Sequence, residues 1–315
     1  MDKLALDKID ILLIDPDRAS RATLRNILVD NGFRNVTQGS GMADIEHKFT
    51  VGMPDLLISD IKLEDGNFNS FVYKLRHHEI GSNPFLPIIA TAWSPTSDEV
   101  RAIVQAGADD IVTKPLSAVQ LLQRIRGQIL TRKPFVVTSV YIGPDRRAAD
   151  AKQRPGEEVI VPVEVPNLLR AKALGDKGLD ISEVQRDIDR CIKNVNLQKI
   201  ERHAHQALFL VERIVPGLAF GGPDESTKRS LQRLLYVAED TGRRMVGTPY
   251  AHVDELCNSL IDVTGRILEA GDFPAPKDVD LLKPLAKAIQ RGFVDGDTEA
   301  AQMAHEISES VLSKL

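Results

Sequence analysis

Three acidic residues and one lysine follow short apolar runs in the first part of the sequence. One run ends in Asp15, with Asp17 two residues further on; a second ends in Asp60, and a third ends in Lys114. Carboxylates that share one place repel each other, so they need a cation, and hard oxygen ligands suit Mg²⁺. A lysine adds a mobile positive charge. Such a set could stabilise a phosphoryl group carried on one of the acids.

These side chains lie together only if the apolar runs are neighbouring strands. Over about the first 130 residues, five short apolar runs alternate with segments of helical period. Five such units predict an α/β fold, a doubly wound five-stranded parallel sheet with helices on both faces. Sites in such sheets lie at the carboxyl ends of the strands. That rule selects Asp15, Asp17, Asp60 and Lys114, and it adds Thr91 at the end of the fourth strand.

Four stretches in this region carry a family resemblance: "LLIDPD", "PDLLISDIKLEDG", "PIIATA" and "AGADDIVTKP". In order and spacing they resemble the receiver domain of two-component response regulators, over about residues 8–130. The resemblance implies a flavodoxin-like fold and a bacterial phosphorelay, with a histidine kinase or phosphotransfer protein as the phosphoryl donor. It implies no enzyme activity beyond autocatalytic phosphoryl transfer to one aspartate and hydrolysis from it.

The resemblance also assigns roles to individual residues. Asp60 matches the phosphoacceptor, and Asp15 matches the first acid of the metal pair. The metal would be Mg²⁺, bound by Asp15, Asp60 and the backbone carbonyl of Lys62. Thr91 matches the switch hydroxyl, and Lys114 matches the lysine that contacts the phosphoryl oxygens.

The sequence departs from the family pattern at two positions of the expected site. Pro16 stands where the family has its second pocket acid, and Ile111 stands at the aromatic switch position. Asp17 lies one residue beyond Pro16, either as a further metal ligand or as the N-cap of the next helix. A phosphorylated receiver and a receiver-like scaffold that signals without phosphate are therefore both open.

The remaining chain divides into two further regions. Residues 131–176 contain five prolines and no sustained helical period, which predicts a linker after a receiver domain of residues 1–130. Residues 177–315 have helical period throughout and predict a helical output domain of about five helices. Within the first domain, Ser117 is expected to cap a helix and Gly107 to end one.

The output is expected to work by protein contact, because no zinc motif, nucleotide-binding loop or output-enzyme signature is present. A DNA-binding transcriptional regulator is the alternative, although interleaved acids and a net charge of −5 argue against nucleic acid. A homodimer stays open. The turn with Arg146 and Arg147 is either solvated or a docking point for a carboxylate or phosphate. With no signal peptide or membrane-spanning run evident, a cytoplasmic protein without a membrane partner is expected.

Overall fold

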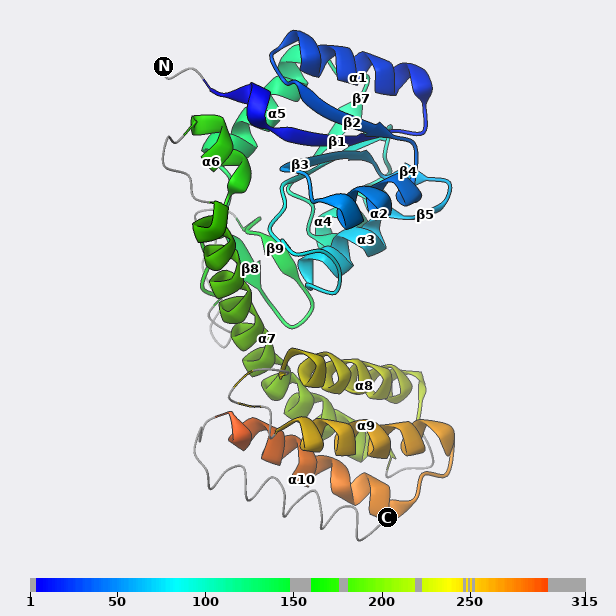
Figure 1. Ribbon diagram of the computed structural model, residues 1–315. Coiled ribbons are helices and arrows are strands. Elements are labelled where there is room, and N and C mark those ends of the chain that lie inside the picture. Colours follow the sequence, from blue (N-terminus) through cyan, green and yellow to red (C-terminus); the bar gives the residue numbers. More distant parts are fainter. Residues whose placement is uncertain are drawn as a thin grey trace. The chain divides into compact units, whose positions relative to one another are not determined.

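The chain forms two units, Met1–Val195 and Asn196–Leu315, which are described separately (Figure 1). No described helix is both long and apolar enough to cross a membrane. The computed structural model describes residues 4–147, 160–175, 181–218, 223–245, 248, 250 and 253–293.

The first unit is built on five parallel strands in the order β2-β1-β3-β6-β7, which confirms the predicted doubly wound sheet. From β1 the sheet extends to β2 on one side and to β3, β6 and β7 on the other, so the strand order reverses between β1 and β3. Folds of this kind have their sites at this position. The strands are β1 (Asp10–Ile14), β2 (Asn35–Gly39), β3 (Leu56–Asp60), β6 (Ile88–Trp93) and β7 (Asp110–Lys114).

Helices cover both faces of the sheet (Figure 1). α1 (Arg18–Asp30) and α5 (Ala118–Leu130) lie on one face. The other carries α2 (Met42–Val51), α3 (Phe68–Arg76) and α4 (Ser97–Ala106). Alternate residues of the central strands pack into the two layers, and both layers are apolar. This double burial explains the unbroken apolar runs of the sequence.

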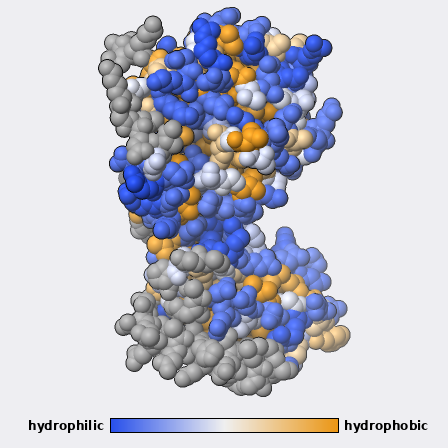
Figure 2. All heavy atoms as spheres, in the orientation of Figure 1, coloured by the Kyte–Doolittle hydropathy of each residue, from blue (hydrophilic) through white to orange (hydrophobic). Residues whose placement is uncertain are grey.

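One helix begins and another ends at the residues predicted from the sequence. The Ser117 hydroxyl accepts a hydrogen bond from the Gln120 N–H at 3.2 Å and caps α5, as predicted. Gly107 ends α4 with φ +102°, a left-handed conformation that favours glycine. On the face shown in Figure 2, hydrophilic residues cover most of this unit, and hydrophobic residues form small separate groups.

The segment predicted to be a linker folds onto the sheet unit where it is described. It contains the hairpin strands β8 (Phe135–Val137) and β9 (Ile142–Pro144) and the helix α6 (Leu168–Leu174). Phe135 packs edge-on against Phe85, with ring centroids 5.8 Å apart. The apolar side of α6 joins the core formed with α1 and α5. Residues 148–159 of the predicted linker lie outside the described residues.

Buried ion pairs and a close contact between backbone segments hold the hairpin of β8 and β9 against the sheet unit. The Asp109 carboxylate accepts from Arg76 Nη2 and from Arg132 Nε, both at 2.8 Å. Both guanidinium groups lie over the Phe135 ring, at 5.2 and 5.1 Å from its centroid. At Gly107 an added Cβ would stand 2.7 Å from the carbonyl oxygen of Ile142, so only glycine permits this approach.

The described part of the second unit is helical, as predicted. It contains α7 (Ile181–Leu218) from Asn196 onward, and α8 (Glu225–Met245), α9 (Asp254–Glu269) and α10 (Pro276–Gly292). The helix expected at residues 297–315 lies outside the described residues.

α7 is one continuous helix, although its apolar pattern changes phase near residues 194–196. Up to Val195 its apolar side chains belong to the core around β8 and β9. From Ile200 onward they belong to the core formed with α8, α9 and α10. The phase shift marks a change of packing partner rather than a turn. The boundary between the units therefore falls at Val195, not near residue 176 as the sequence pattern indicates.

A buried polar cluster joins α7 and α8. Lys199 and His203 are fully buried on α7, and Asp240 and Arg244 are buried on α8. The Arg244 guanidinium donates to Asp240 at 2.9 Å. Burial lowers the pKa of Lys199 to about 7, and the nearby Arg244 charge acts in the same direction.

Lys199→Met is expected to remove a pH dependence of stability. Because the folded-state pKa of Lys199 lies below its usual 10.5, the unfolded chain binds more protons between pH 7 and 10.5. The wild-type free energy of unfolding should therefore rise with pH in this window, and the variant's should rise less. Urea unfolding followed by circular dichroism at pH 7.5 and 9.5 measures this, with the exposed Lys287→Met as control. Equal slopes for wild type and Lys199→Met would contradict it.

Candidate phosphoryl-acceptor site

Asp15, Asp60 and Lys114 converge at the carboxyl edge of the sheet. Asp15 follows β1, Asp60 ends β3 and Lys114 ends β7. Their exposed fractions are 1%, 4% and 6%. The Lys114 Nζ atom lies 2.6 Å from Asp15 Oδ2 and also donates to Asp60 Oδ2. A single ammonium group therefore bridges two buried carboxylates that are 45 residues apart in the sequence.

Local hydrogen bonds hold both carboxylates in place. Asp15 Oδ1 accepts from the Asp17 N–H at 3.0 Å, and Asp15 Oδ2 accepts from the Ser20 hydroxyl at 2.6 Å. Asp60 Oδ1 accepts from the Lys62 N–H at 2.7 Å. Sequence reasoning did not select Ser20, whose place in the first turn of α1 is the signal that could have done so. With two carboxylates and one ammonium, these three groups keep one negative charge that favours a further cation.

Thr91 lies directly beside Asp60 on the neighbouring strand. The two residues are register partners in the β3–β6 pair, and Thr91 is buried. The Thr91 carbonyl oxygen accepts from the Ile61 N–H at 3.0 Å, which fixes the chain just after Asp60. A hydroxyl-bearing side chain is thus positioned next to the candidate acceptor.

Asp17 is the N-cap of α1. Its side chain is exposed, and Oδ1 accepts a hydrogen bond from the Ser20 N–H at 2.6 Å. This is the usual role of an aspartate at the start of a helix. The structure therefore places Asp17 at the helix terminus, whereas Asp15, Asp60 and Lys114 share buried contacts.

Lys62 lies just beyond Asp60 in the short hairpin of β4 (Lys62–Leu63) and β5 (Gly66–Asn67). Its side chain points to α4, where Nζ lies 2.7 Å from Glu99. The hydrogen bond and charge of Glu99 raise the pKa of Lys62. Its backbone, in contrast, contacts Asp60 through the N–H, so the backbone and side chain of Lys62 serve different partners.

Trp93 borders the site at the end of β6. Its side chain is 54% exposed, and Lys114 Nζ lies 5.9 Å from its ring centroid. This is within the range of a cation–π contact. Because Lys114 also holds both carboxylates, a change at Asp60 alters the electrostatic surroundings of this indole, which is the one tryptophan of the chain.

The first unit is thus an α/β domain with a parallel sheet whose carboxyl edge carries two buried carboxylates and a lysine. Residues 11–126 match the family model described as the response regulator receiver domain. The N-terminal region is therefore a receiver domain of the kind found in two-component response regulators.

Curated relatives match a part of the chain that corresponds in length to this region. The chain is 28% identical over 130 residues to the phosphate regulon transcriptional regulatory protein PhoB of Klebsiella pneumoniae, covering 41% of this chain and 56% of that protein. It is 31% identical over 124 residues to the response regulator MprA of Mycobacterium tuberculosis, covering 39% and 52%. The chain thus spans about half the length of the curated relatives it matches.

Solved structures of receiver domains are similar to the same part of the chain. A two-component response regulator from Clostridium difficile is 22% identical, with a TM-score of 0.35, covering 38% of this chain and 94% of that one. The receiver domain of the sensor histidine kinase PA1611 from Pseudomonas aeruginosa, described with a magnesium ion in its active site cleft, is 24% identical. Its TM-score is 0.34, and the similarity covers 38% of this chain and 95% of that one.

Proposed function

We propose that this chain is a bacterial, cytoplasmic response regulator that accepts a phosphoryl group on Asp60. A histidine kinase or phosphotransfer protein is the donor. A carboxylate oxygen of Asp60 attacks the phosphorus of a phosphohistidine, the P–O bond forms, the P–N bond breaks, and the histidine leaves after taking up a proton. Attack of water on the aspartyl phosphate releases inorganic phosphate and restores Asp60. No other enzyme activity is proposed.

The convergence of Asp15, Asp60 and Lys114 carries this proposal. Lys114 is placed to compensate the charge of a phosphoryl group on Asp60, because its Nζ already contacts that carboxylate. Thr91 occupies the neighbouring strand position and supplies a hydroxyl on the same edge of the sheet.

The residues present fit Mg²⁺. Asp15 and Asp60 supply two buried carboxylates with one uncompensated negative charge, and the carbonyl of Lys62 is a further hard oxygen ligand in the sequence next to them. Pro16 supplies no carboxylate, and Asp17 is engaged as a helix cap. Bound Mg²⁺ would neutralise charge on the transferred phosphoryl group. We propose weak Mg²⁺ binding by Asp15, Asp60 and the Lys62 carbonyl, without Asp17.

The helical unit is proposed to signal by protein contact, either with another protein or with a second copy of the chain. α7 supports signalling by protein contact, because this one helix contributes side chains to the core beside β8 and β9 and also to the core of α8–α10. DNA binding gains no support from PhoB or MprA, since the matches cover only 41% and 39% of this chain and about half of each of those proteins. The described helices of the second unit are 16 residues or longer, unlike a short helix-turn-helix pair.

Trp93 fluorescence gives a direct test. Beryllofluoride with Mg²⁺ mimics a phosphoryl group on an aspartate, and it should change the Trp93 emission in wild type but not in Asp60→Asn. The reason is that Lys114 contacts both Asp60 and the indole. Glu46→Gln, an exposed change on α2, serves as the matched control and should respond like wild type. An unchanged emission in wild type, or an equal change in Asp60→Asn, would instead favour the phosphate-independent scaffold.

A further inference from the structure

Arg132 carries unused hydrogen-bond donors in a buried position. Its side chain is 5% exposed, and its Nε donates to Asp109 at 2.8 Å. Its Nη1 and Nη2 atoms are buried, and neither has a hydrogen-bond partner among the described residues. The Arg132 Cζ atom lies over the Phe135 ring, 5.1 Å from its centroid, and an aromatic ring does not replace an oxygen acceptor. Buried charged donors without hydrogen-bond partners destabilise the folded protein. A ligand with acceptor atoms would therefore bind favourably at this position.

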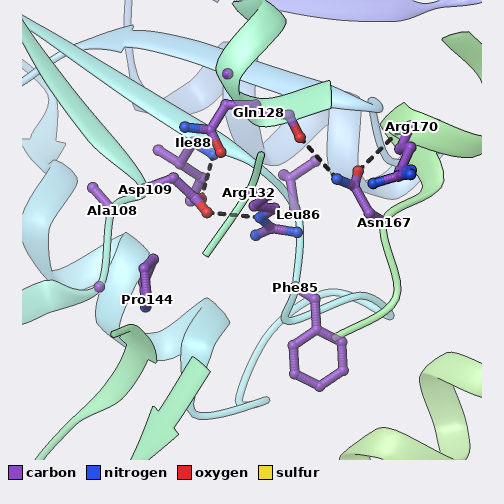
Figure 3. Close-up of polar contacts among 12 residues, drawn as sticks. Phe85, Leu86, Ile88, Ala108, Asp109, Gln128, Arg132, Pro144, Asn167 and Arg170 are labelled. Carbon is purple, nitrogen blue, oxygen red and sulfur yellow. Dashed lines mark hydrogen bonds and ion pairs between the residues drawn. The ribbon is translucent and has the colours of Figure 1, made fainter. Parts of the chain in front are cut away.

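The net positive charge around Arg132 also favours the binding of an anion. Asp109 is shared with the fully buried Arg76, so one carboxylate serves two guanidinium groups. Figure 3 shows its contact with Arg132. Burial lowers the pKa of Arg76 to about 10, which leaves it charged at neutral pH. The pair of arginines with Asp109 therefore keeps one uncompensated positive charge.

Two adjoining cavities, of about 470 and 320 Å³, share Arg132 and Lys133 as lining residues. Their described lining contains five basic and three acidic side chains, and one of these acids is Asp109. A second acid, Asp110, is paired with Arg124 at 3.2 Å. The side-chain amide oxygen Oε1 of Gln128 is also buried without a hydrogen-bond partner among the described residues, and Gln128 lines the larger cavity. The cavities are thus large enough for a small organic molecule and electrostatically suited to an anion.

Arg146 belongs to the same wall. It lines the larger cavity, and its guanidinium donates to the carbonyl oxygen of Ala108. Arg147, the next residue, is instead paired with Asp145 at 2.7 Å. Of the two arginines that the sequence marks as an anion-docking turn, only Arg146 faces this space.

We propose that these cavities bind a phosphate group, either free or carried by a small organic molecule. The two amino groups of Arg132 would donate to two phosphate oxygens in the fork geometry typical of arginine, and Lys133 would add a second charge. This site is distinct from the acceptor edge. Asp109 precedes β7 and Lys114 ends it, so the two sites lie at opposite edges of the sheet.

Isothermal titration of the full chain tests the proposal, in EDTA so that no Mg²⁺ bridges phosphate to Asp60. The probes are inorganic phosphate, adenosine monophosphate and guanosine monophosphate, each against sodium chloride of equal ionic strength. One saturable site is expected. Tighter binding of a nucleotide than of inorganic phosphate would identify an organic phosphate as the ligand, and equal binding would identify phosphate alone.

Variants locate the site. Arg132→Gln should abolish binding, and the exposed Lys133→Gln should weaken it about tenfold, since it removes one charged contact without touching the core. Arg101→Gln changes an arginine that is exposed and lies outside both cavities, and it should bind like wild type. The proposal is overturned if no probe binds more than chloride does, which is the outcome if ordered water satisfies Arg132. It is also overturned if Lys133→Gln binds as wild type.

Discussion

Lys114→Met is expected to destabilise the receiver domain by about 3–5 kcal/mol in EDTA, with Mg²⁺ restoring much of the loss. Removing one partner of a buried ion pair leaves uncompensated charge, and here it leaves two carboxylates, Asp15 and Asp60, facing each other. A divalent cation bound between them replaces the lost ammonium charge. Wild type should gain much less from Mg²⁺, because Lys114 already compensates one of the two charges.

Urea unfolding in EDTA and in millimolar Mg²⁺ measures this difference. Lys74→Met, an exposed lysine on α3, is the matched control and should behave as wild type in both conditions. Should Lys114→Met be equally unstable with and without Mg²⁺, the carboxylates do not form a metal site. If it is as stable as wild type in EDTA, the buried bridge through Nζ is absent from the protein in solution.

Arg76→Met is expected to have a similar cost, about 3–5 kcal/mol, for a different reason. The Arg76 side chain is fully buried, and its Nε donates to the Gly107 carbonyl at 2.8 Å. Nη1 donates to the carbonyls of Pro84 and Leu86 at 2.6 and 2.8 Å, and Nη2 donates to Asp109. Methionine fills part of the volume but removes the guanidinium donors from three carbonyls and one charged donor from the Asp109 carboxylate.

Thermal unfolding compares Arg76→Met with Arg101→Met, an arginine whose side chain is 66% exposed on α4. The control should shift the midpoint little, since exposed ion pairs contribute little. The loss of Arg76 should also free the hairpin of β8 and β9, because Arg132 is then the only guanidinium that holds Asp109 among the described residues. Proteolysis between residues 131 and 147 should therefore accelerate in Arg76→Met. A variant with wild-type midpoint and wild-type proteolysis would contradict this role of Arg76.

The sheet and the convergence of Asp15, Asp60 and Lys114 could be predicted because they follow from local patterns and one topological rule. Strands buried on both faces read as apolar runs, and their carboxyl ends meet at one edge. The position of Asp17 could not be decided from sequence, because an N-cap and a metal ligand need the same residue type at the same place. Only the hydrogen bond to the Ser20 N–H separates the two readings.

The fold of the described residues between 131 and 175 could not be predicted, because their stabilising contacts are long-range. Prolines and short apolar runs are equally typical of a linker and of a hairpin that packs on a neighbouring domain. What holds this hairpin is the meeting of Arg76, Asp109 and Arg132, which are scattered over 56 residues and share no local motif. The phase shift in α7 also has a long-range cause, because the two halves of the helix pack on different cores.

The most direct test of the central proposal is the site of phosphorylation itself. The full chain is incubated with acetyl phosphate and Mg²⁺, reduced with borohydride to trap an aspartyl phosphate, and analysed by peptide mass spectrometry. We predict that the trapped residue is Asp60, and that the Asp60→Asn variant shows no modification. A chain that stays unmodified, or one trapped at another aspartate while Asp60 is intact, would contradict the assignment of Asp60 as the phosphoryl acceptor.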